Sequence, residues 1–284
     1  MTPTVFDELS RTLGAKVTQQ KPLGGGDIND AFAVTLDDDR TVFVKTNRNP
    51  PEGMFPAEAR GLAWLEEAGA LRVPRVLAVS ESFLALEFLR SGKRQAGFDE
   101  ALGRGLASLH AFGAPSFGLG HDNYIGRLYQ SNRVSSDWAS FYWTERLEPQ
   151  LRLASDRGRM GSPVLRRFER LRAALPSLVG GSEPPARLHG DLWGGNLHVD
   201  DEGAPCLIDP AVYGGHREID LAMMRLFGGF SARVFESYAE AYPLLPGAEE
   251  RVSLYQLYPL LVHVNLFGSS YVGSVERALS DCGS

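Results

Sequence analysis

The sequence contains little cysteine and no long apolar run. Cys206 and Cys282 are the only thiols among 284 residues, and no CxxC pair occurs. A disulfide framework is therefore not indicated, and a reducing compartment fits the composition. No stretch approaches the roughly 18 apolar residues of a membrane span, and MTPTVFDELSRTLG has no apolar signal-peptide core. We expect a cytoplasmic protein without a membrane partner.

An excess of positive charge is also absent. The 29 Lys and Arg residues are outnumbered by 35 Asp and Glu, which gives a formal net charge of -6. Non-specific nucleic-acid binding depends on basic surfaces, so we expect no nucleic-acid partner. Apolar residues make up 43% of the chain, enough to bury a full core in one large or two modest domains.

The stretch Arg187–Tyr213 (RLHGDLWGGNLHVDDEGAPCLIDPAVY) carries the chemistry. Asp191 lies in a glycine-rich turn, Asn196 follows at the D-x-x-x-x-N interval of a kinase catalytic loop, and Asp209 ends the apolar run CLI. In such a loop the first Asp accepts the proton of the attacking hydroxyl, while the Asn and the later Asp hold Mg²⁺ across the nucleotide phosphates. A lone HGD would be a plain turn between strands; the combination favours catalysis.

These residues closely resemble a known family. HGDLWGGN, LIDPAVYGGHREIDLAMMRLFGGF and FGLGHDNYIGRLYQSN (117–132) are similar to the fructosamine-3-kinase, or ketosamine-3-kinase, family, a branch of the aminoglycoside-phosphotransferase-like kinases within the protein-kinase-like superfamily. The resemblance spans nearly the whole chain. It implies ATP and Mg²⁺ as cofactors and phosphorylation of the sugar 3-hydroxyl of a fructosamine, ribulosamine or erythrulosamine, on a glycated protein or a small amine, leading to deglycation. It also suggests that 117–132 shapes the substrate side; the alternative is an ordered surface loop.

Apolar periodicity predicts the elements of an α+β, two-lobed, protein-kinase-like fold. We expect a nucleotide-binding lobe over residues 1–88, with a five-stranded antiparallel sheet and one main helix, and a mostly helical catalytic and substrate-binding lobe over 89–284. The predicted strands are 16–23, 31–36, 41–46, 73–79 and 83–88. The predicted helices are 3–13, 55–70, 98–112, 137–146, 164–175, 231–241, 251–267 and one that starts near 217.

Two groups in the first lobe are candidate nucleotide ligands. Lys45 ends the strand pattern VFVK, where a kinase lysine reaches the phosphates, and Glu58 is its natural ion-pair partner. Each alone would be a solvated side chain; joined to the catalytic loop, the pair is favoured. The GGGDIN run is by itself most simply a hairpin turn, but the resemblance places it at the nucleotide loop. Its residues are Gly24, Gly25, Gly26, Asp27, Ile28 and Asn29.

The resemblance also implies a hinge at 86–89, where the backbone of Glu87, Phe88 and Leu89 can hydrogen-bond adenine; the Glu87 side chain is left open as purely structural. Trp193 and Asp220 are grouped on the substrate side. Trp193 either stacks on the sugar or belongs to the core, and we favour the sugar. Asp220 either braces the catalytic loop, as the resemblance implies, or sits at a helix N-terminus for its dipole. His110 receives no role.

Two other function classes remain open. An aminoglycoside-, choline- or homoserine-type kinase shares HGD, Asn and IDP, although the LWGGN and DNYIG resemblance argues against it. A nucleotide-binding pseudokinase that regulates a partner would typically lose a phosphate or metal ligand, whereas Lys45, Asp191, Asn196 and Asp209 are all present. The sequence leaves open the preferred sugar, the free or protein-bound state of the amine, and the oligomeric state.

Overall fold

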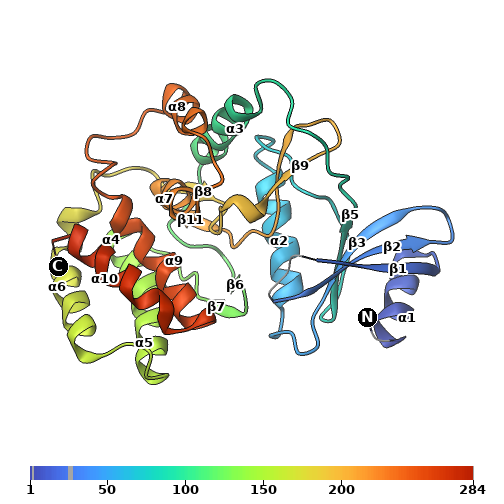
Figure 1. The fold of residues 1–284 in the computed structure, drawn as a ribbon, viewed down its shortest axis with the longest axis horizontal. Coiled ribbons are helices and arrows are strands. Elements are labelled where there is room, and N and C mark those ends of the chain that lie inside the picture. The colour runs from blue at the N-terminus through green and yellow to red at the C-terminus, as the bar shows by residue number, and fades with distance from the viewer. Residues whose placement is uncertain (2, 25–27, 284) are drawn as a thin grey trace.

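The computed structural model describes residues 1, 3–24 and 28–283 and contains the predicted five-stranded antiparallel sheet (Figure 1). Its strand order is β1-β2-β3-β5-β4, so the first three strands form a meander and β5 lies between β3 and β4. The strands are β1 (Val17–Leu23), β2 (Asp30–Leu36), β3 (Thr41–Thr46), β4 (Val76–Val79) and β5 (Phe83–Glu87).

The sheet is covered on both faces because its side chains alternate. On β5, Phe83 and Ala85 pack in one cluster with Leu9 of α1 (Pro3–Leu13). Leu84 and Leu86, on the opposite face, pack in another cluster with residues of α2 (Met54–Glu66). This period-two alternation lets one strand serve two apolar layers. It places α2, which carries Glu58, against β5, the strand that pairs with Lys45 of β3.

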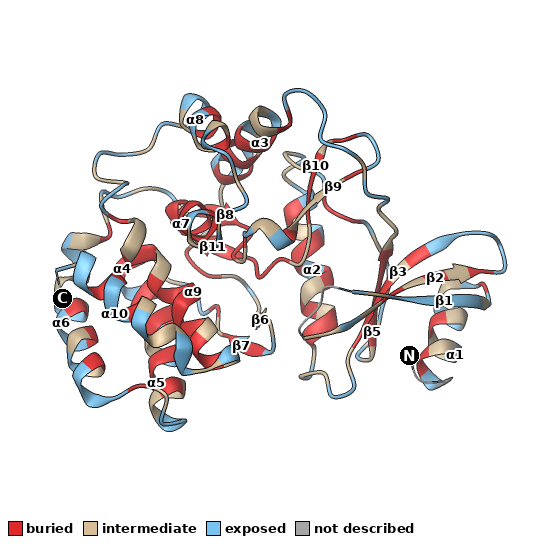
Figure 2. Cartoon of the chain, viewed as in Figure 1, coloured by how far each residue is buried: buried red, intermediate tan, exposed pale blue. Residues whose placement is uncertain are grey.

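The remainder of the described chain is mostly helical, and most of its buried apolar residues fall into two clusters, one of which also includes residues of α2 and β5 (Figure 2). The helices are α3 (Phe98–Phe112), α4 (Trp138–Phe141), α5 (Glu148–Asp156), α6 (Ser162–Leu178), α7 (Glu218–Phe227), α8 (Ala232–Ala241), α9 (Val252–Phe267) and α10 (Val272–Asp281). The predicted helices are confirmed within a few residues, except that a π-helical turn, Tyr142–Leu147, joins α4 to α5. The sequence prediction missed α5 and α10.

Three short two-stranded ladders position the catalytic stretch. They pair β8 (Ala186–Leu188) with β11 (Tyr213–Gly215), β9 (Leu197–Val199) with β10 (Pro205–Leu207), and β6 (Asn123–Ile125) with β7 (Leu128–Gln130). The predicted division after residue 88 falls between the end of β5 and the start of α3 and stays a prediction. None of the described helices has the length and apolar character needed to cross a bilayer.

Candidate active site

A buried histidine links the two loops of the catalytic stretch. The Asp191 N–H donates to His189 Nδ1 at 3.3 Å, so His189 Nε2 carries the ring proton and donates to the Ile208 carbonyl at 2.9 Å. Burial lowers the pKa of His189, which keeps the ring neutral and preserves this tautomer. Gly190 adopts a φ of 81°, and a Cβ there would collide with the Ala211 carbonyl. The HGD sequence therefore lets the loop lie directly on the Asp209 segment.

Asn196 lies between the two predicted carboxylates. Its Nδ2 donates to the Asp191 carbonyl at 2.8 Å and to Asp191 Oδ2 at 3.2 Å, and approaches the Asp209 carbonyl at 3.4 Å. Since Nδ2 is fully engaged, the amide orientation is fixed. In the described part of the chain nothing donates to Asn196 Oδ1, which leaves this oxygen available as a ligand for a hard cation.

Asp209 presents its carboxylate from a left-handed backbone position. Its φ is 56°, a region that Asp tolerates better than most residues, and its side chain is 42% exposed. No cluster of three or more His, Cys, Asp or Glu side chains poised for a metal occurs in the described ranges. Mg²⁺ takes few protein ligands, because phosphates and waters supply the rest, so Asp209 and Asn196 fit such a site.

The predicted ion pair of Lys45 and Glu58 is present. Lys45 Nζ lies 2.7 Å from Glu58 Oε1 and 2.6 Å from Asp209 Oδ1, in a nearly buried position. Burial lowers the pKa of Lys45, but the two carboxylates outweigh it and raise that pKa above its ordinary value. Lys45 therefore stays charged and joins α2 to the Asp209 loop across the sheet.

Asp191 is a carboxylate with a raised tendency to hold a proton. Burial, followed by the negative charge of Asp209, raises the pKa of Asp191 to about 7, although the Asn196 hydrogen bond opposes the shift. A carboxylate poised near neutrality is suited to accept a proton from a hydroxyl.

Asp220 hydrogen-bonds the backbone of the catalytic loop and has no exposed surface. Its two oxygens accept from the backbone N–H groups of His189 and Gly190 at 2.8 and 2.9 Å, and His110 Nε2 lies 3.2 Å from Oδ2. These contacts match the bracing alternative, and the grouping of Asp220 with substrate contacts stays a prediction. His110 was missed, since a histidine on an apolar helix face gives no local signal.

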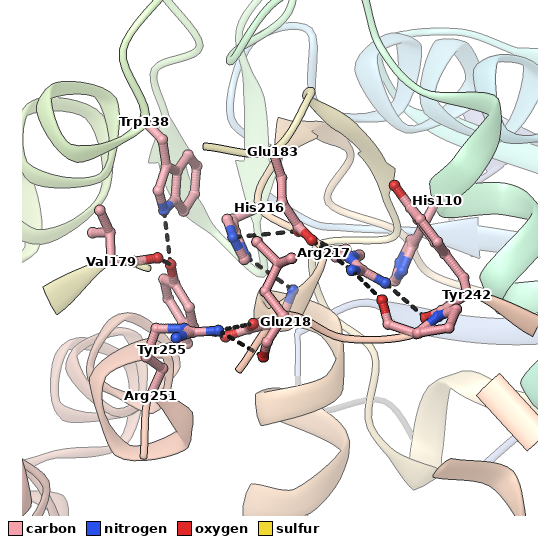
Figure 3. A network of polar contacts seen from close by, with 12 residues as sticks. His110, Trp138, Val179, Glu183, His216, Arg217, Glu218, Tyr242, Arg251 and Tyr255 are labelled. Carbon is pink, nitrogen blue, oxygen red and sulfur yellow. Dashed lines mark hydrogen bonds and ion pairs between the residues drawn. The ribbon is translucent and has the colours of Figure 1, made fainter. Parts of the chain in front are cut away.

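A network of buried ion pairs anchors the start of α7, which carries Asp220 (Figure 3). Arg217 pairs with Glu183 at 2.5 Å, and Glu218 pairs with Arg251 at 2.6 Å. Between them the His216 ring stacks on Tyr255, with centroids 5.2 Å apart. The GGHREID sequence thus attaches α7 to the segment that carries Glu183 and to the start of α9, which keeps Asp220 in register with the catalytic loop.

The structure describes only part of the predicted nucleotide loop, residues 24–29. Gly25, Gly26 and Asp27 lie outside the described residues, whereas Asn47 Nδ2 donates to the Ile28 carbonyl at 3.0 Å and to Asn29 Oδ1 at 2.9 Å. Gly24 is exposed and precedes this contact.

At the hinge, the Glu87 side chain forms an ion pair with Arg75 at 3.2 Å. The backbone N–H of Glu87 donates to the Arg75 carbonyl. The Glu87 side chain and N–H therefore make structural contacts, and the predicted contact of the Glu87 backbone with adenine stays a prediction. No partner within the described ranges accepts from the N–H groups of Phe88 or Leu89.

Trp193 is 41% exposed, so it does not belong to the core. Its ring lies over Gly195, where any Cβ would collide with it, and meets Phe227 edge-on with centroids 6.4 Å apart. An exposed aromatic ring two residues from Asp191 is available to a sugar face; that contact stays a prediction.

We compared the chain with known protein families, proteins and solved structures. A family model described as fructosamine kinase matches residues 1–283. The chain belongs to the fructosamine kinase family. It is 38% identical over 98% of both chains to a "Probable ketoamine kinase" of Enterococcus faecium. It is also 38% identical to a chloroplastic protein-ribulosamine 3-kinase of Oryza sativa subsp. indica, over 96% of this chain and 81% of that one.

Solved structures agree with this family assignment. The crystal structure of a candidate fructosamine-3-kinase from Thermobifida fusca superposes with a TM-score of 0.91, at 38% identity over 99% of both chains. A gentamicin complex of an aminoglycoside phosphotransferase, at 13% identity and a TM-score of 0.67 over 99% of this chain and 95% of that one, shows the fold alone. The predicted two-lobed, kinase-like fold class is confirmed for this fructosamine kinase family member.

Proposed function

We propose that this protein is an ATP-dependent kinase that phosphorylates the 3-hydroxyl of ketosamines. The observation that carries the proposal is the convergence around Asn196, whose amide contacts both Asp191 and the Asp209 backbone, while Asp209 pairs with Lys45. These are the base, the metal ligands and the phosphate-binding lysine of a kinase site, gathered from segments far apart in the sequence. We further propose that residues 1–88 bind the nucleotide and that 89–284 hold the acceptor.

In this mechanism Asp191 orients the acceptor hydroxyl and takes its proton as the oxygen bonds to the γ-phosphorus of ATP, while the bond from that phosphorus to the bridging oxygen breaks and ADP leaves. Asp209 and Asn196 would hold Mg²⁺, which when bound neutralises charge on the phosphates. Lys45, kept in place by Glu58, would exchange its contact with Asp209 for phosphate oxygens. The backbone of Phe88 and Leu89 would receive the adenine edge, and the 24–29 loop would cover the phosphates.

The acceptor class is supported by the names of two relatives, a "Probable ketoamine kinase" and a protein-ribulosamine 3-kinase. We propose the same chemistry here, on a free or protein-bound amine, with Trp193 stacking on the sugar and with the 3-phosphate promoting loss of the sugar. We expect the reaction to take place in the cytoplasm, which cell fractionation of the source organism can check.

An ATP-consumption screen tests the proposal. Purified protein with Mg²⁺ and ATP is offered ribulosamine-, erythrulosamine- and fructosamine-lysine, a glycated protein, an aminoglycoside and choline, and the product is located by phosphorus NMR. We expect turnover on at least one ketosamine, with phosphate on the sugar 3-oxygen, and none with Asp191→Asn. Turnover on the aminoglycoside or choline alone, or nucleotide binding without turnover on any acceptor, would overturn it.

A further inference from the structure

The segment 117–132, which the resemblance assigns to the substrate side, also contributes buried polar side chains; its place on the substrate side stays a prediction. Three amide side chains of the segment 117–132 are buried, namely Asn123, Gln130 and Asn132, with exposed fractions of 4%, 2% and 0%. Buried amides are retained where their hydrogen bonds are satisfied, so their partners indicate what they do.

The partners are backbone carbonyls just beyond the metal ligand Asp209. Asn123 Nδ2 donates to the Val212 carbonyl at 2.8 Å, and Gln130 Nε2 donates to the Ala211 carbonyl at 3.1 Å. The Ala211 N–H, in turn, donates to the His189 carbonyl at 2.9 Å. The peptide groups that follow Asp209 are therefore held between the amides and the catalytic loop.

Arg146 fixes which way these amides face. Its guanidinium can only donate, and Nη2 donates to Asn132 Oδ1 at 2.6 Å. Asn132 must then turn its Nδ2 toward Asn123 Oδ1, at 2.9 Å, which in turn leaves the Asn123 Nδ2 facing Val212. One donor-only group thus orders the chain of amides so that N–H groups reach the carbonyls.

The surroundings of Arg146 indicate that its role is to donate hydrogen bonds and not to form an ion pair. Arg146 has no exposed surface, and within the described ranges no carboxylate lies at ion-pair distance from it. Its guanidinium lies 3.7 Å from the Tyr213 ring centroid and donates to the Ser131 carbonyl at 2.7 Å. Burying a charge costs several kcal/mol. If the side chain served only to fill this space, an apolar residue would therefore be more stable there.

We propose that Arg146, Asn132, Asn123 and Gln130 are positioning residues that set the backbone after Asp209 and thereby aim its carboxylate at Mg²⁺. The inference rests on the proposed function, since it assigns a purpose to the metal site. It predicts that breaking the amide chain weakens binding of the metal–nucleotide complex while sparing binding of the nucleotide alone.

The test compares Asn123→Ala with a matched control, Asn265→Ala. Asn265 is also buried and donates to Gln150 Oε1 at 2.9 Å, joining α9 to α5, and within the described ranges it forms no hydrogen bond with the Asp209 segment. Calorimetry with Mg·ADP, and with ADP in EDTA, gives the two dissociation constants for each full-length variant, and urea unfolding gives their stabilities.

We expect Asn123→Ala to raise the Kd for Mg·ADP about tenfold or more, the effect of removing an outer-shell partner of a metal ligand, with the Kd for metal-free ADP unchanged. Asn265→Ala should lose comparable stability but keep both constants. Arg146→Lys, still donor-only, should bind Mg·ADP more tightly than Arg146→Met; should Arg146→Met fail to fold, Gln130→Ala replaces it.

Equal Mg·ADP affinities for Asn123→Ala and Asn265→Ala overturn the inference, whether or not stability changes. If the wild-type protein nevertheless phosphorylates a ketosamine, the proposed function stands and only the positioning role falls. A wild-type protein that binds no Mg·ADP overturns both.

Discussion

Replacing Asp191 with Asn should abolish turnover and stabilise the protein at the same time. The structure holds this carboxylate in a buried place beside Asp209, which raises its pKa to about 7 from an ordinary value of 3.8. The folded state therefore binds a proton more tightly than the unfolded chain does. The contribution of Asp191 to stability is therefore most favourable at low pH, falls as pH rises between about 4 and 7, and stays reduced above 7.

The size of both effects follows from this shift. About three pKa units correspond to roughly 4 kcal/mol at most, so Asp191→Asn should gain a few kcal/mol at pH 8 and almost nothing at pH 4. Removing a positioned general base lowers kcat by roughly two to four orders of magnitude. Mg·ATP binding should change little, since Asp191 is not among the proposed metal ligands.

The assay is urea unfolding of the metal-free protein across pH 4 to 8, combined with steady-state kinetics on a purified ketosamine. Asp7→Asn serves as the control, because Asp7 is an exposed carboxylate on α1, far in sequence from the site. A stability gain that does not depend on pH would refute the electrostatic reasoning, and near wild-type kcat in Asp191→Asn would refute the assignment of Asp191 as base.

Three further substitutions separate the remaining roles. Asp209→Asn should lose turnover together with Mg·ATP affinity, unlike Asp191→Asn, and nucleotide titration distinguishes the two. Asp220→Asn should lose about 1.5 to 3 kcal/mol in urea unfolding, since one oxygen that accepts from the loop becomes a donor, and should lower kcat more than the ketosamine KM; unchanged stability contradicts the brace. Trp193→Ala should raise the ketosamine KM without loss of stability, because the ring is 41% exposed, and unchanged kinetics remove the sugar contact.

The local sequence was sufficient to predict those elements and motifs whose pattern depends on neighbouring residues. The alternation of β5 and the helical spacing of α3 depend on neighbouring residues alone, so these elements were predicted nearly to their ends. The D-x-x-x-x-N interval fixed Asp191 and Asn196 together, because only a glycine-rich loop of this length lets an amide reach back to the carboxylate. The short strands β6 and β7 and the helix α5 were missed, because they follow a π-helical turn or turn-rich residues with weak periodicity.

The sequence by itself determined the family and the fold class and supplied the candidate catalytic groups, since these reside in short motifs whose spacing reports their chemistry. Only the tertiary structure decided what supports them. Asp220 is buried beneath the loop, His110 reaches it from α3, and Arg146 orders amides that hold the segment after Asp209. Such contacts join residues far apart in the chain. A buried polar side chain shows its purpose only through its partners, which no local pattern contains.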